Sequence, residues 1–213
     1  KYDVQTPTAY EEVDDGGAIS LSSNYVGNFL DSNAIQYASP SYDLGLIGDG
    51  MSMTFHVEYA PEASDTATND GGAAASSTWD NGQSLGITLE GNGVKFGVYG
   101  AEREAGSPDT SVADAFTGVT YLNYTYQQVS VGYSMSYHDN GHDGTTTAAT
   151  TAKAVGVANG IFESDTMSIA FNVNDNLSIS YAKSEDTYDA QSNVAGGTEI
   201  ADVSMDMKSI QAA

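Results

Sequence analysis

The chain has 213 residues, with 29 acidic side chains against 6 basic ones and a formal net charge of −23. This surplus of negative charge excludes a nucleic-acid partner, because the phosphates would be repelled. Cysteine is absent, which excludes a disulfide framework and thiolate metal sites. Only 16% of the residues are charged, and 14 tyrosines accompany many Gly, Ser, Thr and Asn, so the composition indicates folded β-structure with many turns.

Alternating apolar and polar side chains predict the strands. In residues 51–59, Phe55 and Tyr59 lie on an apolar stripe, while Thr54, His56 and Glu58 lie on a polar one. Successive side chains of a β-strand point to opposite faces, so each such stretch has one apolar and one polar face. We expect nine strands, at residues 33–39, 51–59, 84–91, 94–101, 116–126, 129–138, 166–173, 177–184 and 203–213.

Two places depart from the regular pattern. In residues 203–213, Met205 and Met207 are out of phase with Ile210 and Ala212, which indicates a bulge or an incorrect strand assignment. Residues 40–50 form a long connection where a tight turn is expected, and its apolar side chains indicate that the strands extend into it.

The connections between the predicted strands alternate in length. Asn92, residues 127–128 and residues 174–176 are short enough for hairpin turns, whereas residues 60–83, 102–115, 139–165 and 185–202 are long and polar. In an antiparallel meander this order places every tight turn at one end of the sheet and every long loop at the other. Transmembrane barrels have that arrangement, with short periplasmic turns and long external loops.

The apolar stripes fit a lipid surface. Tyr59, Tyr137 and Tyr181 fall on them near the long-loop end of their predicted strands, and Tyr124 and Tyr126 fall beside a tight turn, as two aromatic girdles require. A tilted strand of about ten residues spans a bilayer core. We therefore predict an all-β, antiparallel, up-and-down transmembrane β-barrel. The alternative is a β-sandwich, because one-sided alternation also describes a sheet packed on a protein core.

Several strands resemble those of the Gram-negative general porins, of the marine alphaproteobacterial type. The stretch Asn-Ala-Ile-Gln-Tyr-Ala-Ser-Pro at 33–40 and residues 49–59, 93–101 and 177–184 carry the similarity. The resemblance implies an internal fragment with about nine strands of a probable sixteen. It also implies an outer-membrane location, contact with lipid and lipopolysaccharide, a homotrimer, and passive diffusion of small hydrophilic solutes and cations.

The resemblance also suggests which residues set the selectivity of the pore. Residues 1–32 take the position of an acidic constriction loop, and residues 33–213 form the incomplete barrel. The constriction is expected at Glu11, Glu12, Asp14 and Asp15. The pore lining is expected at Gln36, Thr54, His56, Glu58, Lys95, Tyr99, Ser134, Asp206 and Lys208. With so few bases, such a pore would be net acidic and prefer cations.

The other chemistry in the sequence is weak. His56 with Glu58, and the stretch His-Asp-Asn-Gly-His-Asp at 138–143, could bind a metal. A water-exposed barrel wall explains the first pair better, and a solvated loop explains the second stretch better. No nucleophile–base pair or nucleotide loop can be assembled, so we expect no enzyme, no cofactor and no metal. The competing function is an acidic extracellular β-sandwich that serves as an adhesin or surface-layer domain and binds Ca²⁺.

Overall fold

A computed structural model describes residues 2–3, 6–8, 25–26, 34–45, 49–61, 79–105, 114–139, 160–190 and 203–213. These residues form two antiparallel sheets of two and ten strands. The strands are β1 (Tyr2–Asp3), β2 (Tyr25–Val26), β3 (Ile35–Ala38), β4 (Tyr42–Asp43), β5 (Met51–Ala60), β6 (Trp79–Gly91), β7 (Val94–Ala105), β8 (Ala115–Tyr126), β9 (Val129–Asp139), β10 (Gly160–Asn174), β11 (Leu177–Ala190) and β12 (Val203–Ala212). Within these ranges no helix is long and apolar enough to cross a membrane.

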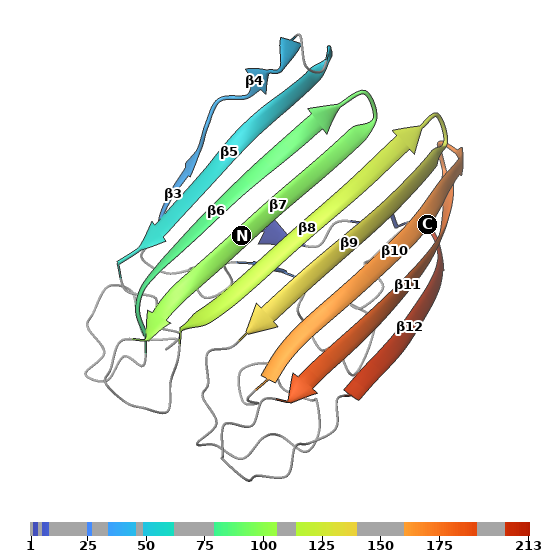
Figure 1. The fold of residues 1–213 in the computed structure, drawn as a ribbon. Coiled ribbons are helices and arrows are strands. Elements are labelled where there is room, and N and C mark those ends of the chain that lie inside the picture. The colour runs from blue at the N-terminus through green and yellow to red at the C-terminus, as the bar shows by residue number, and fades with distance from the viewer. Residues whose placement is uncertain are drawn as a thin grey trace.

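The large sheet is an up-and-down meander. Its strands follow the order β12-β11-β10-β9-β8-β7-β6-β5-β3, and the short β4 also pairs with β5. The sheet is not closed, and in Figure 1 it curves away from the viewer at β11 and β12. The predicted all-β antiparallel class is confirmed. Each of the nine expected strands has a counterpart, and β6, β7, β10 and β11 extend further toward the long connections than their alternation indicated.

Tight turns join the strands at one end of the sheet, the upper end in Figure 1. Asn92 (φ 52°) and Gly93 (φ 78°) join β6 to β7, and Gln127 (φ 54°) begins the turn between β8 and β9. A two-residue hairpin of this kind requires positive φ, which asparagine and glycine adopt at low cost. The segregation of short turns that the sequence indicated is therefore present in the described part of the chain.

The two faces of the large sheet differ in chemistry. Large hydrophobic side chains that remain exposed, such as Leu85, Val131, Ile169 and Phe171, lie on one face, which we call the apolar face. The cross-strand partners Ile87–Val98, Met167–Tyr133 and Phe171–Ile179 share it. The opposite face, which we call the polar face, carries mostly small polar side chains that are buried. This distribution is the reverse of that in an ordinary water-soluble domain, whose large apolar side chains are buried.

The structure corrects the phase of the last strand. Asp206 lies opposite Glu185 and Lys208 opposite Lys183, so both belong to the apolar face and not to the predicted pore lining. Met205 and Met207 are on the polar face instead, and no bulge interrupts the pairing of β12 with β11. The reason is cross-strand packing. Tyr181 faces Ile210 and Ile179 faces Ala212, and such apolar pairs fix the register of a strand.

A second correction concerns the tyrosines. Tyr59, Tyr124, Tyr126 and Tyr181 are exposed on the apolar face and Tyr137 is half-buried there, as the girdle prediction requires. However, β11 continues to Ala190, so Tyr181 is only its fifth residue and lies in the half nearer the tight turn. The strand was expected to end at residue 184 because polar side chains interrupt its apolar stripe from Lys183 onward.

Candidate functional site

The polar face brings most of the predicted pore-lining residues together. Cross-strand pairing places Gln36 opposite Glu58, Thr54 opposite Thr88, and Tyr99 opposite Gly86. The predicted residues on this face are Gln36, Thr54, His56, Glu58, Lys95, Tyr99 and Ser134. Period-two alternation explains why these residues of four strands share one surface. That this surface lines a pore remains a prediction.

Glu58, the one carboxylate of β5, is buried, with 2% of its surface exposed. It accepts hydrogen bonds from Gln36 Nε2 at 2.5 Å and from Ser84 Oγ at 3.0 Å. Each of its two oxygens therefore has a donor on a neighbouring strand, which offsets the cost of taking a carboxylate out of water. The three side chains cross-link β3, β5 and β6 on the polar face.

A chain of contacts runs across the polar face from β5 to β8. His56 Nε2 lies 3.0 Å from Thr88 Oγ1, and Thr88 in turn is hydrogen-bonded to the hydroxyl of Tyr99. The rings of Tyr99 and Tyr121 are stacked, with centroids 6.3 Å apart and planes inclined by 27°. The ammonium group of Lys95 lies 5.9 Å from the centre of the Tyr121 ring, close enough for a cation–π contact.

Lys95 also forms an ion pair with Glu90, its direct cross-strand partner, at 3.7 Å between Nζ and Oε1. Both side chains are about half exposed, so water screens this pair and it adds little stability. The ion pair places a positive and a negative group side by side on the polar face.

The two tyrosines lie flat because glycines face them. A methyl group added at Gly86 would lie 1.9 Å from Cδ1 of Tyr99, and one added at Gly97 would lie 2.5 Å from Cζ of Tyr121. In both cases the glycine is the direct cross-strand partner of the tyrosine. Each ring thus covers the strand beside it and does not project from the face, as glycine allows in sheets where another group approaches the backbone closely.

A second buried carboxylate belongs to β11. Asp186 is 2% exposed, and its Oδ1 accepts hydrogen bonds from Ser164 Oγ at 2.6 Å and Ser184 Oγ at 2.8 Å. Thr166 donates to Ser184 Oγ at 3.2 Å and extends this network along β10. The serine-rich polar stripes of β10 and β11 therefore stabilise one negative charge near the long-connection end of the sheet.

The polar face carries one base that was not predicted from the sequence. Arg103 is buried near the end of β7, opposite Ala115, on the same face as Tyr99 and Lys95. His138 lies two strands away on that face, with its ring 6.2 Å from Phe162. Alternation continued beyond residue 101 would have placed Arg103 there, but the acidic residues on either side of it obscured the pattern.

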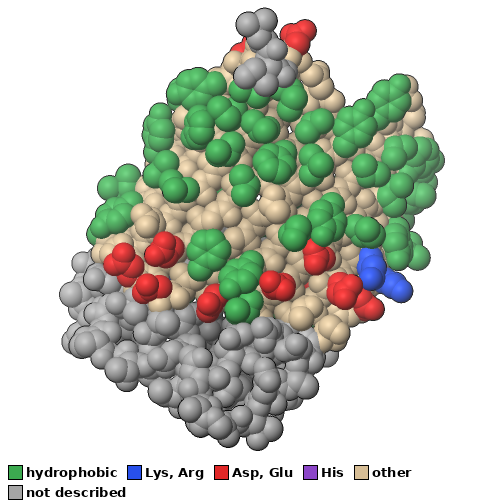
Figure 2. Space-filling view, viewed as in Figure 1, with side chains coloured by type: hydrophobic (Ala, Val, Ile, Leu, Met, Phe, Trp, Pro, Cys, Tyr) green, Lys and Arg blue, Asp and Glu red, His purple; other side chains and the backbone are tan. Residues whose placement is uncertain are grey.

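The apolar face ends at a row of carboxylates. Figure 2 shows the hydrophobic side chains as a broad band, with acidic side chains along its lower margin. Cross-strand pairing, and for Glu104 alternation along β7, assigns these acids to the apolar face at the long-connection end of the strands. We call them the acidic border: Glu102, Glu104, Asp139, Glu163, Asp165, Glu185 and Asp206.

Two lysines interrupt the acidic border. Lys183 and Lys208 are direct cross-strand partners on β11 and β12. The Lys183 ammonium group lies 3.4 Å from Asp206 Oδ1 and 3.6 Å from Glu185 Oε2. These pairs are largely exposed, so water screens them and they add little stability.

Part of the N-terminal segment lies against the polar face. Thr6 is buried, with 6% of its surface exposed, and the ring of Pro7 lies over Gly132 of β9. The strand β2 contacts β8 and β7, and Figure 1 shows a short strand of this segment behind them, on the side turned away from the viewer. The predicted constriction residues Glu11, Glu12, Asp14 and Asp15 are outside the described residues.

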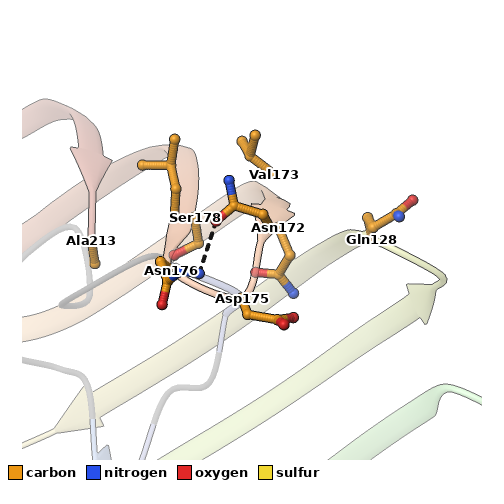
Figure 3. Close-up of a pocket in the computed structure, with 9 residues that line it drawn as sticks. Gln128, Asn172, Val173, Asp175, Asn176, Ser178 and Ala213 are labelled. Carbon is orange, nitrogen blue, oxygen red and sulfur yellow. Dashed lines mark hydrogen bonds between the residues drawn. The ribbon is translucent and has the colours of Figure 1, made fainter.

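A polar depression occupies the tight-turn end of the sheet (Figure 3). It lies between the β8–β9 turn at Gln128 and the β10–β11 turn, where Asn176 N donates to Asn174 Oδ1 at 2.9 Å. Asn172, Asp175 and Ser178 also line it. Amide groups and a single carboxylate give it the chemistry of a solvated turn.

Metal-binding chemistry is not gathered anywhere in the described ranges, since no three His, Cys, Asp or Glu side chains there are arranged to hold an ion. Of the histidine-rich stretch at 138–143, only residues 138 and 139 are described. No protein-family model matches the chain, and no curated protein is significantly similar to it.

Proposed function

We propose that this chain is part of a bacterial outer-membrane porin, a β-barrel that lets small hydrophilic solutes diffuse passively and prefers cations. The observation that carries the proposal is the reversed distribution of side chains over the ten-stranded sheet. The large hydrophobic residues are exposed on one face, and small polar residues cover the other. Strands that cross a bilayer as a barrel require lipid-facing apolar residues alternating with polar residues that face the lumen.

The dimensions of the sheet support the proposal. The strands β5 to β12 have 10 to 15 residues each. About 9–11 tilted residues cross the hydrocarbon core, which leaves the polar ends of the longer strands for the headgroup region. In this proposal the acidic border lies at one boundary of the hydrocarbon core, and the tight turns lie at the other.

Charge supports the cation preference. The net charge of the chain is −23, and the described bases on the polar face are Lys95, which is paired with Glu90, and Arg103. The buried carboxylates Glu58 and Asp186 share that face. A constriction formed by Glu11, Glu12, Asp14 and Asp15, the outer-membrane location, the contact with lipopolysaccharide and the homotrimer are parts of the same proposal, and they rest on the resemblance to general porins.

The β-sandwich adhesin is the weaker alternative. A sandwich buries its apolar faces against each other at about 10 Å. In the described part of the chain the apolar face is exposed, and the two-stranded sheet lies at the polar face instead.

The test is reconstitution of the whole protein. We expect extraction to require detergent, and the purified protein to form conducting channels in planar bilayers whose reversal potential under a salt gradient reports cation preference. A water-soluble protein that forms no channels, or one whose melting temperature rises with Ca²⁺, would favour the adhesin. Channels that prefer anions would contradict the assignment of the polar face as an acidic lumen.

A further inference from the structure

The contact between Pro7 and Gly132 joins two parts of the chain that are 125 residues apart in sequence. A methyl group added at Gly132 would lie 2.3 Å from Pro7 Cδ and 2.3 Å from Asn123 Oδ1. Real Cβ atoms essentially never approach another atom so closely, so the two side chains occupy the space that glycine leaves on the polar face of β9. Asn123 is the direct partner of Gly132, whereas Pro7 comes from outside the large sheet.

Neighbouring observations show that this contact is not isolated. Thr6, next to Pro7, is 6% exposed. Further along the segment, β2 contacts β7 and β8, the strands that carry Tyr99, Val119 and Tyr121. These three side chains form a small apolar cluster with Ala60 and Ala101 on the otherwise polar face. Burial of apolar groups stabilises their packing against neighbouring surfaces, so the cluster suits a docking surface better than a wall open to water.

We propose that Gly132 is a positioning residue for the N-terminal segment, and that the described parts of this segment (β1, residues 6–8 and β2) are held on the polar face by the Pro7–Gly132 contact. The absence of a side chain at position 132 sets how closely the segment approaches β9. A larger residue there would push Pro7 away. If the polar face lines a pore, which is the proposed function, the same contact sets how much of the passage the segment occupies.

Disulfide cross-linking tests the contact directly, because the chain has no cysteine of its own. The variant Pro7→Cys with Gly132→Cys places two thiols where the two backbones approach, and the exchange of proline removes the ring that would clash. The matched control is Pro7→Cys with Val131→Cys, because Val131 is the next residue of β9 and is exposed on the apolar face. Both variants are made in the whole protein, folded in detergent and oxidised mildly.

We expect the Gly132 pair to give a cross-linked band whose faster gel mobility is reversed by reductant, and the Val131 pair to give none. Equal cross-linking of both pairs, or none with Gly132, would overturn the proposal. A second measurement tests the proposal even if the double-cysteine variants do not fold. Thr6→Cys alone should react at least tenfold more slowly with a water-soluble maleimide than the same thiol does after Gly132→Leu is added. Equal rates would overturn the proposal as well.

Conductance separates this inference from the proposed function. In planar bilayers the cross-linked Pro7–Gly132 variant should conduct within about twofold of its reduced form, because the segment stays on the wall. A larger rise on reduction would mean that the segment leaves the wall during conduction, and the fixed contact would be wrong. Specific cross-linking in a protein that forms no channels would refute the porin and leave the contact standing.

Discussion

The flat tyrosines of the polar face lead to a prediction about Gly86. Replacing Gly86 with alanine puts a methyl group 1.9 Å from Cδ1 and 2.5 Å from Cε1 of Tyr99. Carbon atoms in ordinary contact are about 3.5–4.0 Å apart, so the ring must move by roughly 1.5–2 Å. Because the ring lies along the sheet, it can move only outward from the polar face. That movement also separates the Tyr99 hydroxyl from Thr88, to which it is hydrogen-bonded.

The energies of these changes can be estimated separately. Overpacking a well-filled site costs about 1–3 kcal/mol, and the lost hydrogen bond about 0.5–1.5 kcal/mol. Replacing glycine with alanine also stabilises the strand by about 0.5–1 kcal/mol, because glycine loses more conformational entropy on folding. We expect Gly86→Ala to lower the free energy of unfolding by about 2 kcal/mol, measured by urea titration of the detergent-folded protein.

Two further variants make the Gly86 test specific. Gly118→Ala lies on the apolar face, where the nearest atom, Cε1 of Phe116, is 3.3 Å from the added methyl group. We expect that control to change stability by less than about 0.5 kcal/mol. In a Tyr99→Ala background the ring is gone, so Gly86→Ala should no longer destabilise the protein, which gives a coupling of about 1–3 kcal/mol. Equal effects of Gly86→Ala in both backgrounds would refute the reasoning.

The remaining predictions concern the two faces and their charges. Ile169→Arg puts a charge on the apolar face and should destabilise the bilayer-inserted protein by about 2–4 kcal/mol in folding titrations with lipid vesicles, while Ala170→Arg on the polar face should not; equal effects would contradict the lipid assignment. Lys95→Gln should shift the reversal potential toward stronger cation preference, and Lys183→Gln on the apolar face should leave it unchanged; a shift with Lys183→Gln alone would reverse the assignment of faces. Glu58→Leu removes the acceptor of the buried Ser84 hydroxyl and of the Gln36 amide, and should lower stability by about 1–3 kcal/mol, more than Glu58→Gln does, as read from urea titration.

Much of the fold could be predicted because a strand repeats every two residues. In β9 the alternation of Val129, Val131 and Tyr133 with small polar residues is unbroken, and the strand lies within one residue of its predicted end. The predicted strands were too short where apolar and polar side chains no longer alternate. On the apolar face of β10, Glu163 and Asp165 precede Met167, so the first six residues of that strand gave no apolar stripe.

The candidate site was harder to predict, since it depends on pairing between strands. Alternation alone assigned Lys95 and Tyr99 to the polar face, and pairing with β6 places them there. It could not show that Tyr99 lies over Gly86, because that contact requires the register of β6 with β7. In β12, where apolar side chains occur in both phases, only pairing with β11 decides which residues share a face.

The acidic border gives the sheet a direction. Its carboxylates, among them Glu163, Asp165 and Glu185, lie at the ends of the strands that meet the long connections, and the opposite ends close in turns of two residues such as Gln127–Gln128. Moving an ionised carboxylate through hydrocarbon is expensive. In a bilayer this cost would keep the acidic border at one interface, because any shift of the sheet along the membrane normal toward its tight turns would draw carboxylates into the hydrocarbon.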